Sequence, residues 1–208
     1  MSVFPERFES DRLCYERVHP ESLDPLELYN HVSEDAPAID EITEYVPWEP
    51  HSHPQETVEF VDDCGRAFDD GEYLTCSIRP KDGDDAEEIA GLASLGVEWD
   101  TLSAEIGIWL RKPFWGRGYS GERAARFLKL AFSHLDLEVV KTSHFPGNAK
   151  SKRAVNQYVK RFRGEKEGRI RNAVVIDGKP HDTVQYSITR EEWEESQKAT
   201  THQSQLAD

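Results

Sequence analysis

The stretch FWGRGYSGERA, residues 114–124, places three glycines between two segments of contrasting pattern. Before it, AEIGIWL (104–110) alternates apolar and other residues as a β-strand does, and after it SGERAARFLKLAFSHL (120–135) repeats apolar residues at helical spacing. Glycine lets a backbone turn tightly and approach a ligand closely. A strand, a glycine loop and a helix in this order predict an anion site, because loop N–H groups would lie at the positive end of the helix.

A dinucleotide-binding site, a P-loop and a plain strand–helix turn could each account for such a loop. Gly116, Gly118 and Gly121 satisfy both the dinucleotide pattern G-x-G-x-x-G and the first half of a P-loop. A dinucleotide fold places its loop in a parallel βαβ unit with an acid at the end of the next strand, and here that strand ends in SHF. A P-loop requires Lys and Ser or Thr where this chain has Glu122 and Arg123. Both nucleotide interpretations are disfavoured, and a plain strand–helix turn would need one glycine rather than three.

The periodicity of the remaining chain predicts a mixed α+β fold. Strands are expected at 12–19, 73–79, 89–99, 104–110, 138–145, 167–177 and 183–189. Helices are expected at 21–32, 53–68, 120–135 and 146–162, the last opening with Asn148 as its N-cap. Short polar turns between three consecutive strands indicate an antiparallel meander, and GKPHD (178–182) is expected to join the last two strands as a hairpin. Residues 34–53, rich in Pro, Glu and His, indicate a loop or broken helix.

The charge of the chain restricts its partners. Forty acidic residues against 25 basic ones give a formal net charge of −15. This balance argues against general nucleic-acid binding, so no direct nucleic-acid partner is expected. A dense carboxylate surface also suits high salt, where mutual repulsion is screened, and we hypothesise a halophilic origin.

One segment departs from this acidity. Between residues 150 and 171 there are nine basic side chains and two acidic ones, Glu165 and Glu167, a net charge of +7. The basic residues are Lys150, Lys152, Arg153, Lys160, Arg161, Arg163, Lys166, Arg169 and Arg171. Two interpretations stay open, a solvated helix face and a landing site for a polyanion.

Neither a membrane nor a metal is expected. No run of about 18 apolar residues exists, and the start MSVFPERFESDR lacks the apolar stretch of a signal peptide, so a cytoplasmic location is the default expectation. Cys14, Cys64 and Cys76 form no C-x-x-C pair and are expected to be packed thiols. His51 and His53 form H-x-H, but the sequence nominates no two further ligands.

The loop in its chain context resembles motif A of the GCN5-related N-acetyltransferases (GNAT superfamily), Q/R-x-x-G-x-G/A, with Trp115 replacing Gln/Arg. FWGRGYSGERA is similar to the YWGxGYAxEA segment of the RimJ/RimL-type branch, the ribosomal-protein N-terminal acetyltransferases, with Ser120 where Ala is common. Further matching pieces in order are ESDRLCYERV, AEIGIWL, N-x-x-S-x-R at 148–153 and EGRIRNAVVIDGKPHDTVQYSIT, so that the resemblance spans roughly residues 7–193. One departure is YVKRFRGEKEG, about one helical turn longer than the Leu-Gly-Phe ending of the family's fourth helix.

The resemblance implies a single domain over residues 1–195 with the acyl-CoA N-acyltransferase (GNAT) fold: a three-layer α+β arrangement with a mixed, mostly antiparallel sheet of about six to seven strands flanked by helices. Residues 196–208 are expected to be a polar, disordered tail. The implied cofactor is acetyl-CoA, without a metal. The implied acceptor is a primary amine, in the first place a protein N-terminus, and the implied state is a monomer or homodimer. Alternatives are a small-molecule amine acceptor and a non-catalytic CoA-binding regulatory module.

The resemblance also assigns the cofactor residues. Glycines in the loop would expose N–H groups to the diphosphate, and Asn148 would bond the pantetheine arm besides capping its helix. Lys152 would join Lys150 and Arg153 in neutralising the phosphates. The cofactor-binding set is Ile108, Trp109, Leu110, Gly116, Arg117, Gly118, Tyr119, Ser120, Gly121, Asn148, Lys150 and Arg153.

Three residues are candidates for catalysis. Glu105 matches a glutamate of the family and is the candidate base, directly or through water, although it could be a surface carboxylate. Ser151, the serine of N-x-x-S, is a candidate proton donor to the thiolate or simply a first-turn helix serine. Tyr158 is a rival acid, but its spacing also suits the helix core face. Tyr45, Trp48 and His51 are assigned to the mobile lip over the acceptor groove.

Overall fold

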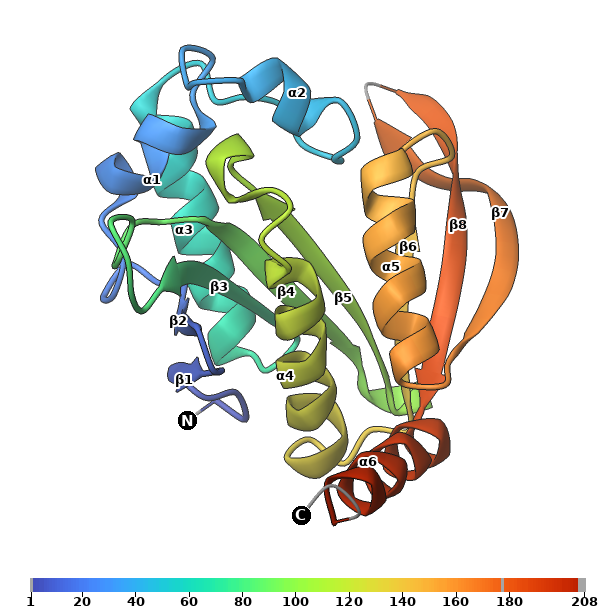
Figure 1. Ribbon diagram of the computed structural model, residues 1–208. Coiled ribbons are helices and arrows are strands. Elements are labelled where there is room, and N and C mark those ends of the chain that lie inside the picture. The colour runs from blue at the N-terminus through green and yellow to red at the C-terminus, as the bar shows by residue number, and fades with distance from the viewer. Residues whose placement is uncertain (1, 177, 206–208) are drawn as a thin grey trace. The chain divides into compact units, whose positions relative to one another are not determined.

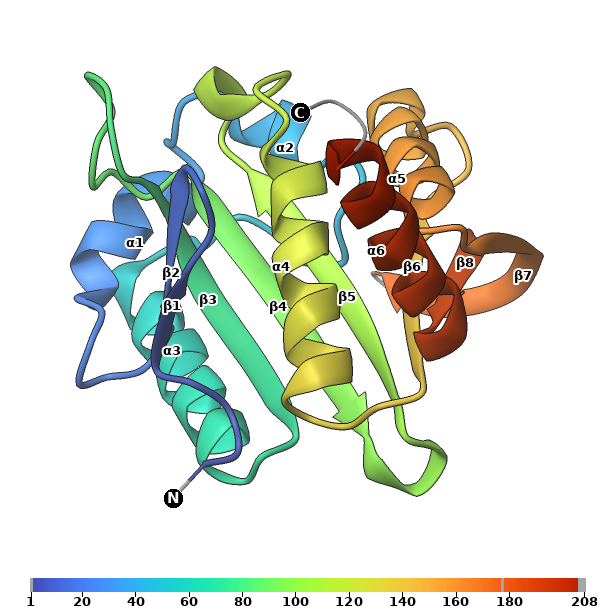
Figure 2. The same ribbon diagram turned by 60° about the horizontal axis from the view of Figure 1, so that its bottom comes forward.

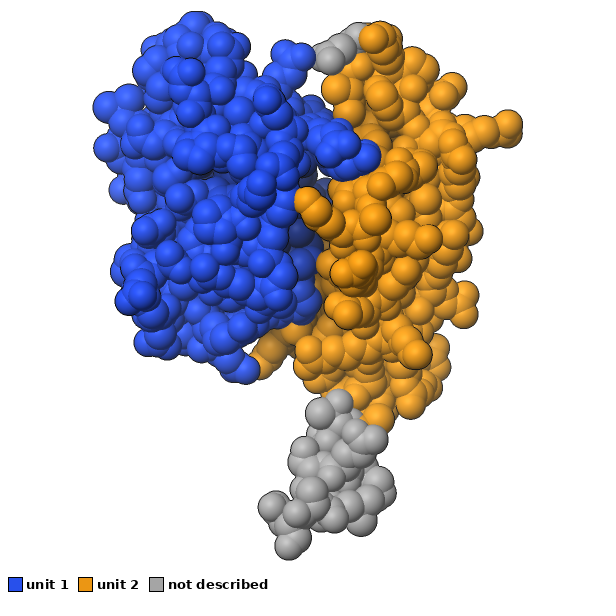
Figure 3. All heavy atoms as spheres, turned by 45° about the horizontal axis from the view of Figure 1, so that its top comes forward, with its two compact units in different colours: residues 1–97, 107–123 blue, residues 98–106, 124–208 orange. Residues whose placement is uncertain are grey.

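The structure is a computed structural model, and it describes residues 2–176 and 178–205. It contains two compact units: unit 1 comprises residues 1–97 and 107–123, and unit 2 comprises residues 98–106 and 124–208 (Figure 3). Strand β5 (Ser103–Leu110) and helix α4 (Tyr119–Ser133) each contribute to both units. A single domain over residues 1–195 stays a prediction, since two compact units do not decide whether the whole folds cooperatively.

Unit 1 carries the N-terminal strands and three helices (Figure 1). Its strands are β1 (Arg7–Glu9), β2 (Leu13–Arg17), β3 (Tyr73–Pro80), β4 (Gly91–Glu98) and the second half of β5. Its helices are α1 (Pro25–Val32), α2 (Ile39–Thr43), α3 (Pro54–Asp69), the 3₁₀ turn η2 (Lys112–Phe114) and the first turn of α4. Helix α3 packs against β3, and α1 packs against α3.

Local sequence explains where these helices start. The Asp24 side chain accepts a hydrogen bond of 2.9 Å from the Leu26 N–H, and Pro25 occupies the first helical position of α1. Helix α3 likewise begins with Pro54, and it buries Val61, Cys64 and Phe68 of the apolar stripe that its periodicity predicts, while Val58 of the same stripe is half-buried. These helices cover a core cluster with members from α1, α3 and β4. The cluster comprises Val18, Leu23, Leu28, Val32, Val61, Cys64, Ile89 and Leu92, with Trp48, Phe60 and Trp109 packed against it.

Unit 2 carries the C-terminal strands and helices (Figure 2). Its elements are η1 (Trp99–Thr101), the first half of β5, most of α4, β6 (Val139–His144), α5 (Ala149–Arg161), β7 (Glu165–Ile176), β8 (Lys179–Thr189) and α6 (Arg190–Gln205). Helix α5 packs on β6 and β8, and α6 packs against β8. Helix α5 buries Val155, Tyr158 and Val159, so its predicted core face is confirmed.

The strands form one mixed sheet in the order β1-β2-β3-β4-β5-β6-β8-β7. Pairs β1–β2, β2–β3, β3–β4, β6–β8 and β7–β8 are antiparallel, and β5–β6 is parallel. The predicted mixed, mostly antiparallel sheet flanked by helices is confirmed. Its strand number is eight rather than six to seven. The additional strand β1 has three residues, too few for a period-two pattern to be visible in the sequence.

One expectation about the C-terminal part is corrected. GKPHD does not form the hairpin connection, because β8 begins at Lys179 and His181 pairs with Val174 inside the ladder. Helix α6 runs from Arg190 to Gln205 and so extends into the segment from residue 196 that is expected to be a tail; residues 206–208 lie outside the described residues, and the tail stays a prediction. In the described part of the chain no helix is long and apolar enough to cross a membrane.

Candidate functional site

The glycine loop of unit 1 has the backbone that its sequence predicts. Gly116 and Gly118 have φ values of 77° and 82°, in the left-handed region that L side chains rarely adopt. Gly121 lies within the first turn of α4 at an ordinary φ. A Cβ atom added at Gly116 or Gly121 would meet no atom within 4 Å, so the surface above the loop is open to a ligand.

The N–H groups of this loop are available to an anion. Within the described chain, the backbone N–H groups of residues 116–120 donate to no other group. The next two N–H groups, of Gly121 and Glu122, donate to the Gly118 carbonyl at 3.1 Å and 3.2 Å and close the first turn of α4. Free N–H groups at a helix start carry partial positive charge, so the loop fits a diphosphate.

Contacts from the turn between β1 and β2 hold Glu122 in the first turn of α4. Its carboxylate accepts hydrogen bonds of 2.7 Å from Ser10 Oγ, from the Arg12 N–H and from Arg12 Nε. Burial raises the pKa of Glu122, but these hydrogen bonds outweigh burial and hold the pKa below its ordinary value. The acid that sequence reasoning set against a triphosphate is therefore neutralised by Arg12.

The flanks of the loop are also fixed. Trp115 Nε1 donates to the Leu110 carbonyl at 2.8 Å, and Arg12 Nη1 donates to the Arg117 carbonyl at 3.0 Å. The Arg117 guanidinium donates to Asp85 at 2.7 Å and lies 4.9 Å from the centre of the Phe114 ring. Because its side chain is held by Asp85, we expect Arg117 to serve an anion chiefly through its backbone N–H.

The second half of β5 leads into this loop. Its residues Ile108, Trp109 and Leu110 are partly buried, and the Trp109 ring lies 5.3 Å from the Trp48 ring, centroid to centroid. The parallel pairing of β5 with β6 covers only Ser103 to Glu105. Beyond Glu105, the edge of β5 that pairs with β6 has no strand partner in the described chain, which leaves backbone groups for a ligand.

Unit 2 carries the candidate catalytic residues. Glu105 is exposed on β5, and its carboxylate accepts a hydrogen bond of 3.0 Å from Ser143 Oγ on β6. Tyr158 is buried, and its hydroxyl lies 2.9 Å from Thr142 Oγ1, which donates to the Ile106 carbonyl at 3.4 Å. Glu105 is thus accessible to an acceptor, while Tyr158 belongs to a buried hydrogen-bond chain.

The start of α5 is built as the sequence predicts. The Asn148 side chain accepts a hydrogen bond of 2.9 Å from the Ser151 N–H, so the predicted N-cap is confirmed. Ser151 is partly buried in the first turn, and Lys150 and Arg153 are exposed beside it.

The segment predicted to be the acceptor lip is anchored in unit 1. His51 Nδ1 lies 2.7 Å from Thr57 Oγ1, and the His51 ring meets the Phe60 ring edge-on at 6.1 Å. Burial lowers the pKa of His51. Tyr45 and Trp48 are partly buried. Among the described residues no three His, Cys, Asp or Glu side chains group to hold a metal ion, and His51 serves as a structural contact.

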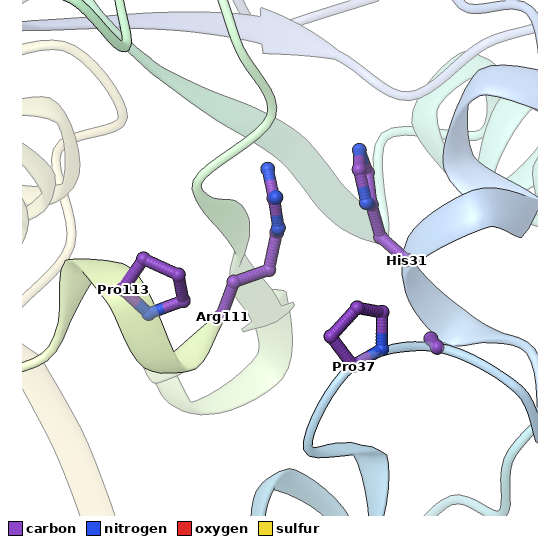
Figure 4. Close-up of a pocket in the computed structure, with 5 residues that line it drawn as sticks. His31, Pro37, Arg111 and Pro113 are labelled. Atoms are coloured by element: carbon purple, nitrogen blue, oxygen red, sulfur yellow. The ribbon is translucent and has the colours of Figure 1, made fainter.

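Two hollows in unit 1 were not found by sequence reasoning. An open groove of about 420 Å³ is lined by Glu34, Ile39, Asp40, Glu49 and Pro50. A smaller cavity of about 30 Å³ is lined by Ala36, Pro37 and Pro113 together with the His31 and Arg111 side chains (Figure 4). Of the groove's acids, Asp40 lies in the short helix α2 and Glu34 and Glu49 lie in the loops around it, so no sequence pattern predicts that they line one groove.

The fold and the loop define a class of protein. A family model described as an acetyltransferase (GNAT) domain matches residues 12–158, well over half of the chain. The chain therefore belongs to the GNAT acetyltransferase family.

Individual relatives agree with this family. A Bacillus subtilis (strain 168) protein named "Putative ribosomal N-acetyltransferase YdaF" is 35% identical over 107 residues, 51% of this chain and 56% of that protein, so the match spans little more than half of the relative. A GCN5-related N-acetyltransferase from Brucella melitensis has a TM-score of 0.74 at 20% identity, covering 95% of this chain and 86% of that chain. The microcin C7 self-immunity acetyltransferase MccE, solved with acetyl-CoA and AMP, has a TM-score of 0.75 at 18% identity over 90% of this chain and 98% of that chain. The last two likenesses are in fold alone.

Proposed function

We propose that this protein is an acetyl-CoA-dependent N-acetyltransferase that acts on a primary amine, in the first place a protein N-terminal α-amine of the ribosomal-protein type. The observation that carries the proposal is the row of free N–H groups at residues 116–120, at the start of α4. Family membership supports the reaction type, and the acetyl-CoA bound in MccE supports the donor.

The residues present fit the cofactor. Open space above Gly116 and Gly121 admits a diphosphate to the N–H groups of the loop. Ile108, Trp109 and Leu110 would offer backbone groups to the pantetheine arm, Asn148 would bond it from α5, and Lys150 and Arg153 would neutralise phosphate charge. Bound acetyl-CoA supplies an activated acetyl thioester.

Side chains of this protein would accept and donate the protons of the reaction. Glu105 is exposed and receives the incoming amine's proton directly or through water, while Ser143 holds its carboxylate in one orientation. Ser151 is the better proton donor to the departing thiolate, since the Tyr158 hydroxyl is engaged with Thr142. Tyr158 acts as a positioning residue that fixes β6 against α5.

Two observations favour a protein N-terminus as acceptor. An α-amino group has a pKa near 8 and a lysine one near 10.4, so deprotonation at pH 7 costs about 1.4 kcal/mol for the first and roughly 4.6 kcal/mol for the second. An exposed carboxylate such as Glu105 suits the smaller demand. The groove of unit 1 lined by Glu34, Asp40 and Glu49 carries carboxylates whose charge suits a basic peptide, and one relative is named "Putative ribosomal N-acetyltransferase YdaF".

Thiol release from acetyl-CoA tests the proposal. Purified protein is offered peptides with basic sequences and free N-termini, the same peptides with blocked N-termini, and a panel of polyamines and amino acids. We expect release with the free basic peptides and none with the blocked ones. If only the small amines are acetylated, the acceptor is a small-molecule amine rather than a protein N-terminus. Calorimetric binding of acetyl-CoA without turnover of any amine would indicate a regulatory module, and absence of binding would refute the proposal.

A further inference from the structure

Helix α5 carries an unusual charge distribution for this chain. All of its charged side chains are basic: Lys150, Lys152, Arg153, Lys160 and Arg161, within a protein of net charge −15. All five are exposed. The first turn holds no acid, so its cations face the positive end of the helix dipole, an arrangement that a bound anion would relieve.

The neighbouring strand β7 extends this surface. Lys166 pairs with Tyr186 of β8, which in turn pairs with Thr142 of β6, so the three side chains lie on one face of the sheet. The hydrogen bond between Thr142 and Tyr158 shows that this face is the one covered by α5. The acidic neighbour Glu167 instead bonds Ser187, on the opposite face. Strand β7 therefore adds a cation on the α5 side and keeps an acid away from it.

Ion pairs neutralise only part of the basic segment. Arg163 pairs with Glu195 at 2.6 Å, and Arg169 pairs with Asp182 at 2.7 Å. We define the α5 basic face as the exposed cations of α5, together with Lys166 of β7, that have no ion pair with another described residue. They are Lys152, Arg153, Lys160, Arg161 and Lys166.

The proposed cofactor site accounts for only one end of this face. Ten residues separate Lys150 from Lys160, which is about 15 Å along a helix. Screening at physiological salt limits charge interactions to about 8 Å. Phosphates held near Lys150 and Arg153 therefore leave Lys160, Arg161 and Lys166 for another anion.

We propose that the α5 basic face binds the phosphate backbone of a nucleic acid. Its other exposed positions on α5 include the amides Asn156 and Gln157, which can bond phosphate and sugar oxygens. The exposed face of α5 has no aromatic or large aliphatic side chain, whereas protein interfaces are centred on such anchors. A basic, polar surface fits phosphates better than it fits an acidic protein.

This inference revises the expectation of no nucleic-acid partner. That expectation rested on the net charge of −15, which describes the chain as a whole. Because screening confines electrostatic attraction to the nearest charges, the local cations decide binding at this face, and the acidic remainder repels a polyanion elsewhere. The inference stands independently of the acetyl-transfer proposal.

Fluorescence anisotropy with labelled 20-nucleotide oligouridylate and oligothymidylate tests it, with a fluorescent polyglutamate peptide as the acidic-protein arm. We expect both oligonucleotides to bind the full-length protein at low salt and the peptide to bind at least tenfold more weakly. Equal affinity for the two oligonucleotides would support binding through phosphates alone, and tighter oligouridylate binding would add a contact to the 2′-hydroxyl. Peptide binding as tight as that of the oligonucleotides, or no oligonucleotide binding at all, would overturn the proposal.

A charge-matched pair of variants locates the site. Lys160→Glu with Lys166→Glu should weaken oligonucleotide binding at least tenfold and lower the slope of log K against log salt by about one for each lost phosphate contact. Lys129→Glu with Lys198→Glu changes the net charge equally, at exposed lysines of α4 and α6, and should leave binding within about twofold. Equal losses in the two double variants would refute a localised site. Acetyl-CoA affinity, measured by calorimetry, should be the same in both.

Discussion

The Ser143 hydroxyl donates a hydrogen bond of 3.0 Å to the exposed carboxylate of Glu105. The two residues lie on parallel neighbouring strands, and Glu105 pairs with Lys141, so that Ser143 is the next residue on the same face. This hydrogen bond uses one carboxylate oxygen of Glu105 and orients the carboxylate group, and the other oxygen takes no part in it. Among the described residues no ion pair holds this carboxylate, since the Lys141 ammonium bonds Ser103 and pairs with Glu98, so the carboxylate is oriented for proton transfer and keeps its charge.

Replacement of Glu105 by Gln should therefore lower kcat/KM for an amine acceptor by about 10²-fold, at the lower end of general-base effects. Glutamine keeps the hydrogen bond from Ser143 but cannot take a proton. Thiol release measured across pH 6 to 9 checks this, and the loss should shrink at high pH, where more of the amine is already neutral. Ser143→Ala should lose less than tenfold. An unchanged rate in Glu105→Gln would remove the residue from catalysis without touching the family assignment.

Substitution of Ser151 should lower kcat, whereas substitution of Tyr158 should lower the stability of the fold. Ser151→Ala should lower kcat with little change in thermal stability, because its backbone N–H, rather than its hydroxyl, bonds Asn148. Tyr158→Phe removes the hydroxyl that meets Thr142 and should cost about 1 kcal/mol in free energy of unfolding, with kcat within about threefold of the parent. Urea unfolding and steady-state kinetics on both variants distinguish these outcomes. A large kcat loss in Tyr158→Phe with unchanged Ser151→Ala would reverse the two roles.

The sequence predicted those parts of the fold that depend on local pattern. Gly116 and Gly118 adopt the conformations that glycine permits, and Asn148 caps its helix, because backbone freedom and capping act over three or four residues. The β5-loop-α4-β6-α5 order followed from periodicities alone. These local rules sufficed to predict the anion loop, whereas the family followed from the resemblance of its motifs to those of known acetyltransferases.

Contacts between distant segments could not be predicted in this way. From the sequence, the negative charge of Glu122 was expected to repel phosphate. Arg12, more than a hundred residues away in the chain, neutralises this charge. The sequence of Lys179 to His181 predicted a turn, but these residues pair with β7 and belong to β8. The contacts of His51 with Thr57 and Phe60 could not be predicted either. Each of these contacts involves a partner that pattern analysis of one segment cannot identify.

Gly91 should not tolerate a side chain. A Cβ atom there would lie 2.1 Å from the Trp109 carbonyl oxygen, at a φ of 157°. Gly83 also has positive φ, at 95°, but a Cβ there meets nothing within 4 Å, so Gly83→Ala is a matched control for conformational cost alone. We expect Gly83→Ala to lower the free energy of unfolding by about 1 kcal/mol and Gly91→Ala to lower it by about 2–4 kcal/mol. Denaturant titration measures both, and equal losses would contradict the close approach of Gly91 to Trp109.

Glu122 should make stability depend on pH in the acid range. Its hydrogen bonds from Ser10 and Arg12 hold its pKa below the ordinary value, so its contribution is complete above the unfolded pKa of about 4.3 and is lost as pH falls through the lower folded pKa. Glu122→Gln should cost about 1–3 kcal/mol at pH 7, because the charge-assisted bonds to Arg12 are weakened.

Urea unfolding of parent and variant at pH 7, 5, 4 and 3.5 should give a difference that is constant from pH 7 to 5 and smaller at 4 and 3.5. Glu72→Gln, at an exposed carboxylate that has no ion pair with another described residue, should differ from the parent by less than about 0.5 kcal/mol at every pH. A Glu122→Gln difference that grows on acidification would mean that the carboxyl is protonated more readily in the folded protein than in the unfolded one. In that case Arg12 does not neutralise it, and the glycine loop beside it would present a less favourable site to an anion than its N–H groups suggest.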